Sequence, residues 1–446
     1  MVSCQVVSYI GLLKEIPYGV SRSALRNYVL KILQTLNPNL RRTLVILGGS
    51  GLMFWSSLAS LLPGLPLYIQ SLGGTDQQIG LTMGTFAIGL LIFRPPLGQL
   101  TDHYSRKLVV LIGLAAVAIA PMGYLYFPTI PMVMATRIFH GISIAAFTTA
   151  YTALVVDIAP EQQRGELIGY MSLVNPIGVA IGPALGGLLL EYLGYPGLFM
   201  VSTFLGTIGF ICTWFVEEPP RPVLQGHTPQ TQTLQFHKVL TNPALSLPTW
   251  VLLLVGTAFG SLISFLPLYM QAVQVNLNSG FFYAAAALSS ILIRILVGRA
   301  SDRFGRGVFI TLSLVLYTAS MFLLSGVPAP NPQPWWFLLA GAFEGAGSGI
   351  LIPTAIALVA DRSDPIHRGQ IFGICIGGFD LGIALGGPLL GLVSQYFGYS
   401  ILFASNGIFT ITAIILFLTM SNITLQDSFR FATGRTQDFY HHKMQK

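Results

Sequence analysis

Four ionisable side chains well within long apolar stretches of this chain could bind or move protons. They are Arg137, His140, Glu344 and Asp380. An ionisable group in such surroundings is costly and usually faces a cavity or a partner. A desolvated carboxyl group favours its neutral form, so it can exchange protons near neutral pH, and when charged it attracts cations. These residues are the candidates for proton coupling and substrate binding, and our hypothesis is that Arg137, Glu344 and Asp380 form one coupling centre.

Each of these residues also has a structural interpretation. Histidine titrates near physiological pH, so His140 could itself carry protons, but a structural, hydrogen-bonded histidine is the favoured interpretation. At 1.5 Å per helical residue, Glu344 and Asp380 lie far from their helix ends, near the middle of a membrane. The alternative for these two carboxyl groups is a structural hydrogen bond to a glycine-rich neighbour.

The composition predicts that the elements carrying these residues span a membrane. Of the 446 residues, 53% are hydrophobic and 9% are charged, whereas soluble domains average about 25% charged residues. A membrane-spanning helix needs roughly 20 apolar residues. The sequence therefore predicts an all-α membrane protein with twelve transmembrane helices. These are expected at about 43–70, 78–97, 108–127, 131–157, 165–190, 196–216, 247–271, 279–298, 307–326, 335–360, 369–393 and 399–420.

The distribution of positive charge predicts the orientation. If the loops alternate sides, every Lys or Arg in a loop falls on one side, and the loops of the other side have none. This positive-inside bias places both termini in the cytoplasm of a multi-pass protein of the cell (plasma or inner) membrane. The net charge of +7 is then explained by topology, and nucleic-acid binding is excluded as a partner class.

A repeat divides the chain into two like halves. Asp157, Arg164, Gly178 and Gly182 recur 204 residues later as Asp361, Arg368, Gly382 and Gly386. Six helices per half make the repeats parallel, with a binding site expected between them. The expected domains are an N-terminal tail (1–42), two six-helix bundles (43–217 and 247–420), a polar cytoplasmic linker (218–246) and a C-terminal tail (421–446).

The loop after the second helix of each half carries a carboxylate and an arginine four residues apart, which can form a charge-assisted latch. This loop resembles the Gly-x-x-x-Asp-Arg-x-Gly-Arg-Lys signature of the major facilitator superfamily, although the first copy has His103 and Ser105 in place of Arg and Gly. The resemblance implies a role in conformational gating; the alternative is a plain positive anchor. The gating residues are Gly98, Asp102, Arg106, Gly298, Asp302, Arg303 and Arg306.

One further motif resembles the drug:proton efflux branch of that superfamily. The fifth helix carries Gly178, Gly182, Pro183, Gly186 and Gly187, in a pattern similar to the antiporter motif of the branch. Glycines four residues apart let helices approach closely in lipid, and proline bends a helix. The fourth helix resembles the family's Arg-x-x-Gln-Gly pattern, whose Arg is implicated in proton coupling.

In that fourth-helix pattern Arg137 stands at the arginine and His140 at the glutamine. The proton-coupling role that the resemblance implies therefore falls on Arg137, and His140 is a departure from the pattern. Four charged residues at the cytoplasmic ends are expected instead to form structural ion pairs with the gating loops. They are Asp157, Arg164, Asp361 and Arg368.

These features favour a monomeric secondary transporter that exports small, fairly apolar compounds in exchange for protons, by alternating access. The alternative is an importer or facilitator of sugars or other small metabolites on the same fold. An enzyme is disfavoured because the sequence has no nucleophile–base set, metal-ligand spacing or phosphate loop. The expected partners are a small-molecule substrate, protons and the lipid bilayer. No cofactor and no metal are expected.

Overall fold

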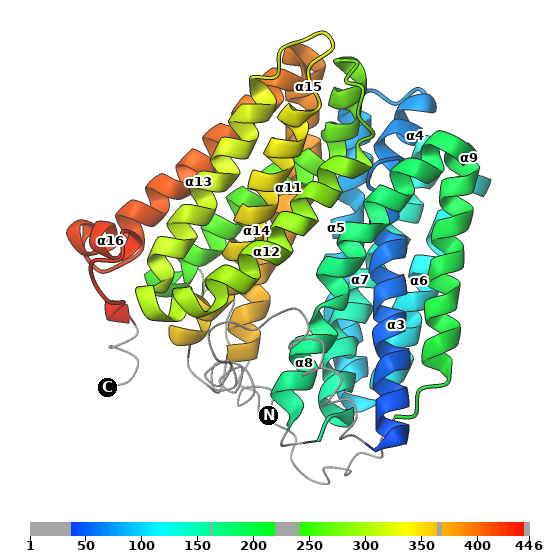
Figure 1. Cartoon of the computed structure of the whole chain (residues 1–446), viewed down its shortest axis with the longest axis horizontal. Coiled ribbons are helices and arrows are strands. Elements are labelled where there is room, and N and C mark those ends of the chain that lie inside the picture. The colour runs from blue at the N-terminus through cyan, green and yellow to red at the C-terminus, as the bar shows by residue number, and fades with distance from the viewer. Residues whose placement is uncertain (1–36, 161–162, 219–238, 240, 364–367, 441–446) are drawn as a thin grey trace.

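The chain folds into helices, and no strand occurs among the residues that the structure describes (Figure 1). The structure is a computed structural model that describes residues 37–160, 163–218, 239, 241–363 and 368–440. Most of the expected N-terminal tail and linker therefore lies outside the described residues. The helices are α3 (Pro38–Ser60), α4 (Leu65–Ser71), α5 (Asp76–His103), α6 (Arg106–Tyr126), α7 (Ile130–Ile158), α8 (Arg164–Ser172), α9 (Val174–Trp214), α11 (Pro243–Ala272), α12 (Gly280–Phe304), α13 (Arg306–Ser325), α14 (Trp335–Asp361), α15 (Arg368–Met420) and α16 (Leu425–Ala432).

Local sequence signals set several helix starts. Thr75 caps the start of α5 in a capping box, in which its hydroxyl accepts from the Gln78 N–H while the Gln78 side chain accepts from the Thr75 N–H. Asn242 caps α11, which therefore begins at Pro243, earlier than the sequence predicted. These caps satisfy backbone donors that would otherwise be unpaired at a helix start.

Ten helical stretches of the described chain are long and apolar enough to cross a membrane. Two of them, Leu167–Trp214 and Ile371–Met420, contain 48 and 50 residues, far more than the roughly 20 that one crossing needs. Each contains a glycine with positive φ, Gly194 at 65° and Gly398 at 82°. Residues with a Cβ rarely adopt this conformation, so each glycine marks a sharp reversal inside its long segment.

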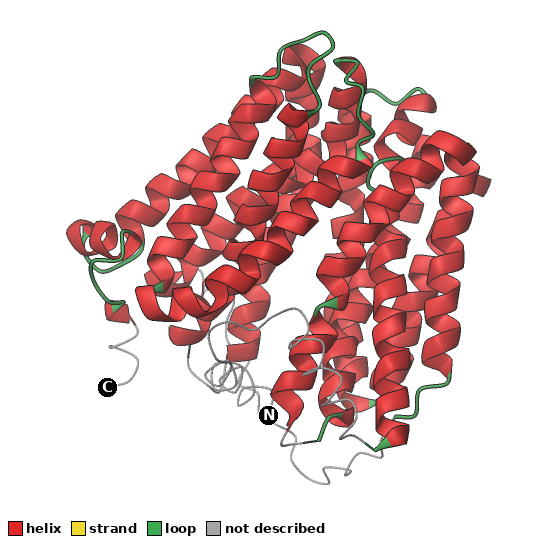
Figure 2. Ribbon diagram, in the orientation of Figure 1, coloured by secondary structure: helices red, strands yellow, loops and turns green. Residues whose placement is uncertain are grey.

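The helices form two groups with the same pattern of packing. In the first group α3 packs on α9, α5 on α7, and α6 on both α7 and α9. In the second, α11 packs on α15, α12 on α14, and α13 on both α14 and α15. The groups contact each other through α5 with α15 and through α9 with α12. Figure 2 shows the two groups converging toward one end and diverging toward the other.

The hydrophobic core also joins the two groups near one end only. One buried cluster belongs to the first group alone and includes Phe54, Phe147 and Leu154. The larger cluster joins side chains of α4 and the start of α5, such as Ile69 and Met83, to the side chains of the second group. Burial of apolar surface therefore holds the two groups together near the end where α5 begins.

The C-terminal segment differs from the expected tail. Residues 425–432 form α16, whose start is capped by Thr424, and Phe431 on this helix is 4% exposed. The fully buried Arg362 donates to Asp438 Oδ2 at 2.7 Å and to the Ser421 carbonyl at 2.7 Å. A buried arginine that is satisfied in this way fixes the segment against the bundle.

Candidate functional site

An ion pair links the two groups of helices inside the membrane-spanning region. Nη1 of Arg94, on α5, lies 2.5 Å from Oδ2 of Asp380, on α15. The side chains are 30% and 11% exposed. Low-dielectric surroundings strengthen such a pair, and they also make either partner costly if it is left alone and charged.

Small residues bring the two helices close enough for this pair to form. A Cβ added at Gly84 would lie 2.6 Å from the Ala384 carbonyl oxygen, and Gly80 meets the backbone of Gly387. The helices run antiparallel here, because residue numbers rise along α5 as they fall along α15. Close approach through small residues is the usual way helices pack in lipid. The Arg94–Asp380 pair lies farther from the start of α5 than these glycine contacts.

Two side-chain hydrogen bonds join the groups toward the end where α5 begins. Tyr399 Oη donates to Asp76 Oδ1 at 3.0 Å. Asn278, just before α12, donates from Nδ2 to Glu191 Oε2 on α9 at 3.1 Å. The described side-chain contacts between the groups, including the Arg94–Asp380 pair, therefore lie between the level of the start of α5 and the level of Arg94.

Arg137 is buried in the first group without a carboxylate partner among the described residues. It is 7% exposed, its Nη2 donates to the Met83 carbonyl at 3.1 Å, and its guanidinium lies 4.5 Å from the centre of the Phe86 ring. Its Nε has no hydrogen-bond partner in the described part of the chain. A buried cation that lacks a carboxylate remains able to attract an anionic group.

His140 lies one turn along α7 from Arg137 and is completely buried. Its Nδ1 is 2.9 Å from Tyr124 Oη, and its ring packs edge-on against Phe86. Its Nε2 has no partner among the described residues. One ring nitrogen of His140 is thus hydrogen-bonded, as the structural interpretation expects, and the other has no partner among the described residues.

Glu344 is 5% exposed on α14 and accepts a hydrogen bond from Tyr317 Oη at 2.8 Å. Both residues belong to the second group of helices. The partner is a phenol and not the glycine-rich neighbour that the sequence suggested as the structural alternative. A neutral donor leaves the protonation of the carboxyl group free to change.

The three residues of the hypothesised coupling centre therefore have three different partners. Asp380 pairs with Arg94, Glu344 with Tyr317, and Arg137 with the Met83 carbonyl and the Phe86 ring. Sequence reasoning did not select Arg94 as a candidate site residue. The available signal was its position four residues before Gly98, which places it inside the helix and not in the loop.

The first gating loop is anchored by charge to the end of α7 and to Glu218, which follows α9. Nη1 of Arg106 lies 2.5 Å from Oδ1 of Asp157 at the end of α7. The Arg106 N–H donates to Glu218 Oε1 at 2.9 Å, and Ser105 Oγ donates to Glu218 Oε2 at 2.5 Å. Gly98 and Asp102 lie in the last turns of α5, and Asp102 is engaged in an interaction. Glu218 was missed by sequence reasoning because it lies where the linker was expected.

The second gating loop contains a counterpart of the Arg106–Asp157 ion pair. Arg306, the first residue of α13, pairs through Nε with Oδ2 of Asp361 at the end of α14. The Arg303 guanidinium lies 5.5 Å from the centre of the Phe304 ring. Gly298 lies within α12, and the side chains of Asp302 and Arg368 lie outside the described part of the structure.

Arg164 differs from the expected ion pairing. It begins α8 and is partly buried, and its Nε has no hydrogen-bond partner among the described residues. The ion pairs of the described residues include Asp157 and Asp361 but not Arg164. The carboxylate of Asp157 pairs instead with Arg106 of the first gating loop.

The antiporter-like motif packs α9 against two helices. A Cβ at Gly182 would lie 2.7 Å from the Ser56 carbonyl oxygen, and Gly178 and Gly186 also meet α3. Gly187 instead meets the Asn278 side chain, and the Pro183 carbonyl meets Gly280. The motif therefore allows α9 to contact both its own group and the start of α12.

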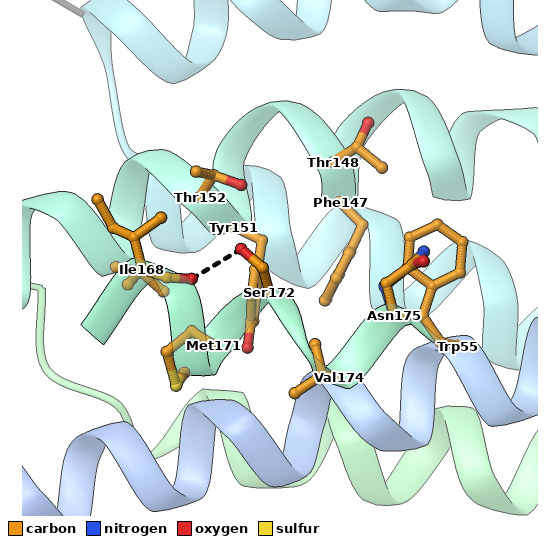
Figure 3. Close-up of a pocket in the computed structure, with 11 residues that line it drawn as sticks. Trp55, Phe147, Thr148, Tyr151, Thr152, Ile168, Met171, Ser172, Val174 and Asn175 are labelled. Carbon is orange, nitrogen blue, oxygen red and sulfur yellow. Dashed lines mark hydrogen bonds between the residues drawn. The ribbon is translucent and has the colours of Figure 1, made fainter. Parts of the chain in front are cut away.

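An uncharged pocket of about 150 Å³ lies among α3, α7, α8 and α9 (Figure 3). Phe147 stacks on Phe54 with ring centres 3.8 Å apart, and Tyr151 stacks on Phe147 at 4.7 Å. Ser172 Oγ donates to the Ile168 carbonyl at 2.7 Å. The lining residues are Trp55, Phe147, Thr148, Tyr151, Thr152, Val155, Ile168, Met171, Ser172, Val174 and Asn175. Within the described ranges, no cluster of His, Cys, Asp and Glu could hold a metal ion.

The chain is similar over most of its length to curated bacterial proteins. It is 25% identical over 86% of its length to a multi-drug resistance efflux pump PmrA homolog of Lactococcus lactis, of which it covers 95%. It is 27% identical over 82% to the staphylopine export protein of Staphylococcus aureus, of which it covers 92%. It is 26% identical over 85% to multidrug resistance protein MdtG of Salmonella paratyphi A, covering 94%.

Solved structures share the fold at low sequence identity. A point mutant of the nucleoside transporter NupG aligns with a TM-score of 0.73 at 15% identity, over 85% of this chain and 99% of that one. A bacterial homolog of the human lysosomal transporter Spinster, inward-facing and unoccupied, aligns with a TM-score of 0.67 at 16% identity, over 90% and 99%. These likenesses concern the fold alone.

The family assignment rests on a match along nearly the whole described chain. The family model described as Major Facilitator Superfamily matches residues 46–331 and 287–433. It covers all ten apolar stretches apart from the first turns of α3. This agrees with the resemblance found in the gating loops and in the fifth helix. The chain belongs to the Major Facilitator Superfamily and is a multi-pass membrane transporter.

Proposed function

We propose that this transporter exports small, largely apolar compounds in exchange for protons, by alternating access. The observation that carries this proposal is the Arg94–Asp380 ion pair between the two groups of helices. Asp380 can be charged and paired, or protonated and released from Arg94. Protonation of one buried carboxyl group would thus alter a contact that has to change when the groups move. This is the connection that a proton-coupled transporter requires.

The uncharged pocket supports an apolar, partly aromatic substrate. Trp55, Phe147 and Tyr151 provide aromatic surface, while Thr148 and Asn175 add a few hydrogen-bonding groups. Apolar walls with few polar groups are typical of small-molecule sites. Relatives whose names describe multidrug efflux and staphylopine export support the outward direction.

Glu344, Arg137 and His140 are proposed as auxiliary sites. Glu344 is a second buried carboxyl group able to accept a proton, with Tyr317 as its donor when charged. Arg137 and the open Nε2 of His140 provide a positive charge and a polar atom in the first group. A charged or polar part of the substrate could satisfy them during transport.

The proposed architecture has twelve crossings in two like halves, 43–217 and 247–420. Support comes from Gly194 and Gly398, which divide the two longest apolar stretches, and from the matching helix pairings of the two groups. The arginine-rich gating loops support an orientation with both termini in the cytoplasm of the cell membrane. The described contacts between the groups then close the outer side.

Import or facilitated movement of a sugar or another small metabolite is the alternative. Thr148, Thr152, Ser172 and Asn175 in the pocket favour it, because they could bond to the hydroxyl groups of such a substrate. This alternative requires no proton and no outward direction. The two proposals therefore differ in their response to a pH gradient.

Transport in inverted membrane vesicles tests the proposal. Vesicles containing the full chain should accumulate a lipophilic aromatic compound when their interior is acidified, and a protonophore should abolish the accumulation. Vesicles without the transporter serve as the control for leakage, and the Asp380→Asn variant should show no accumulation driven by the gradient. Sugar uptake that does not depend on the gradient, without accumulation of the aromatic compound, would support the alternative and refute the proposal.

A further inference from the structure

A groove with a volume of about 610 Å³ lies between the end of α15 and α16. The membrane-spanning stretch of α15 ends at Met420, and α16 begins at Leu425. So short a connection cannot carry the chain far from the end of a crossing, so α16 lies at the membrane surface. Figure 1 shows it at the outer edge of the second group of helices.

The wall formed by α16 is held firmly in place. Ser428, Phe431 and Ala432 face the bundle and are buried. Thr311 Oγ1 donates to the Ala432 carbonyl at 2.9 Å, and Ser421 Oγ donates to the Ser428 carbonyl at 3.2 Å. The groove is therefore preformed and does not require the helix to fold upon binding.

The opposite face of α16 exposes two apolar side chains, Leu425 and Phe429, beside Gln426 and Arg430. Leu425 is 65% exposed and Phe429 is 51% exposed, and across the groove Ile415 is 54% exposed. Leu418 also lines it. Side chains of this kind at the end of a membrane crossing are suited to hydrocarbon chains, because lipid surrounds the helix ends.

Two arginines lie on the rim of the same groove. The Arg435 N–H donates to the Arg430 carbonyl at 2.7 Å, which holds the two residues together. Neither arginine forms an ion pair with a described residue. Two carboxylates close to them in sequence have other partners: Asp427 accepts from the Thr424 hydroxyl at 2.6 Å, and Asp438 accepts from Arg362 at 2.7 Å. The rim thus carries two arginines that form no ion pair within the described chain.

We infer that this groove binds one anionic phospholipid. Its phosphate lies between Arg430 and Arg435, and an acyl chain runs along Ile415, Leu418, Leu425 and Phe429. Arginine binds phosphate in a bidentate manner, and the apolar groove excludes a ligand that is only charged. Neither the uncharged pocket nor the Arg94–Asp380 pair contributes to this site, so the inference does not depend on the proposed function.

Native mass spectrometry of the full chain in detergent, titrated with phosphatidylglycerol, tests the inference. The double variant Arg430→Gln/Arg435→Gln should lose one tightly bound lipid. The loss is about fivefold in affinity for each arginine near an anionic surface, so it is on the order of thirtyfold for both. The matched control Arg41→Gln/Arg42→Gln removes two exposed charges from the start of α3 and should bind lipid normally.

Further measurements separate the possible ligands. Arg430→Lys/Arg435→Lys should retain most of the binding, while Leu425→Gln should weaken it by removing the apolar wall. Phosphatidylcholine with the same acyl chains should bind more weakly than phosphatidylglycerol. Equal phosphatidylglycerol binding by the wild type and the Arg430→Gln/Arg435→Gln variant would overturn the inference. So would displacement of the lipid by inorganic phosphate alone, because the groove would then be an anion site without an acyl chain.

Discussion

Arg94 and Asp380 join the two groups of helices through a 2.5 Å ion pair, with Asp380 the more buried partner. The two residues are 286 positions apart in the chain. They meet because Gly80 and Gly84 of α5 allow α15 to approach its backbone closely. The one carboxyl–guanidinium contact between the groups within the described chain thus lies beside a tight, glycine-lined helix contact. A proton on Asp380 would remove the charge from this junction.

Cross-linking the groups should stop transport. Glu191 and Asn278 are hydrogen-bonded at 3.1 Å, so Glu191→Cys/Asn278→Cys should react with a short bifunctional thiol reagent. Alternating access requires α9 and the start of α12 to separate, and the link prevents this. Substrate transport, measured before and after linking in a background free of other cysteines, should fall to the level of empty vesicles.

The control for this experiment lies within the first group. Ser105 and Glu218 are hydrogen-bonded at 2.5 Å and belong to elements of the same group. Linking Ser105→Cys to Glu218→Cys joins elements of one group, so it should reduce transport much less than the Glu191→Cys/Asn278→Cys link does. Undiminished transport by the linked Glu191→Cys/Asn278→Cys protein would contradict a separation of the groups at this end.

Gly182→Ala should loosen the packing of α9 on α3. The new Cβ would lie 2.7 Å from the Ser56 carbonyl oxygen and 2.9 Å from the Ala59 Cβ, so backbone must move. Overpacking of this kind costs roughly 1–3 kcal/mol. Thermal unfolding in detergent should show a lower Tm, whereas Gly377→Ala, with no atom near the added Cβ, should not. An equal effect of the two changes would argue against this packing.

Trp55→Ala should weaken binding of an aromatic substrate. Trp55 lines the uncharged pocket. Removal of its ring costs roughly 1–2 kcal/mol of contact, or about tenfold in Kd. Substrate binding can be measured by a scintillation proximity assay with the purified protein. Trp250→Ala is the matched control because Trp250 is 51% exposed on α11, away from the pocket. If both variants bound substrate with wild-type affinity, the pocket would not be the substrate site.

Breaking the Arg106–Asp157 ion pair should destabilise the first gating loop. Arg106→Gln leaves Asp157 without its guanidinium, and the two side chains are only 18% and 22% exposed. Loss of a charged hydrogen bond in such a place costs on the order of 1–3 kcal/mol. The swap Arg106→Asp/Asp157→Arg should recover part of the lost Tm. Failure of the swap together with an unchanged Tm for Arg106→Gln would show that the pair contributes little.

Much of the fold could be predicted from sequence because lipid imposes simple rules. Apolar length predicted the membrane-spanning stretches, and the repeated Asp and Arg residues predicted carboxylate contacts at the gating loops. The structure places Asp157 against Arg106 and Asp361 against Arg306. These contacts are local to each half, so spacing along the chain sufficed to suggest them.

The partners of the buried charges could not be predicted in the same way. Asp380 meets Arg94 across the junction of the two groups, and Glu344 meets Tyr317 on a neighbouring helix. Such contacts depend on how each helix is rotated, which an almost uniformly apolar helix does not reveal. The fold of residues 425–432 was missed for a related reason, since Phe431 on its buried face lies 5.7 Å from the guanidinium of Arg362, which follows α14.

The most direct test of proton coupling is the response of Asp380→Asn to an imposed pH gradient in proteoliposomes. The variant should lose gradient-driven accumulation while retaining exchange of labelled for unlabelled substrate, because asparagine cannot change its charge. Asp76→Asn is the matched control, since Asp76 also bridges the groups, through Tyr399, but at the start of α5. Our account predicts accumulation in the control and none in Asp380→Asn. Wild-type accumulation by Asp380→Asn would contradict it.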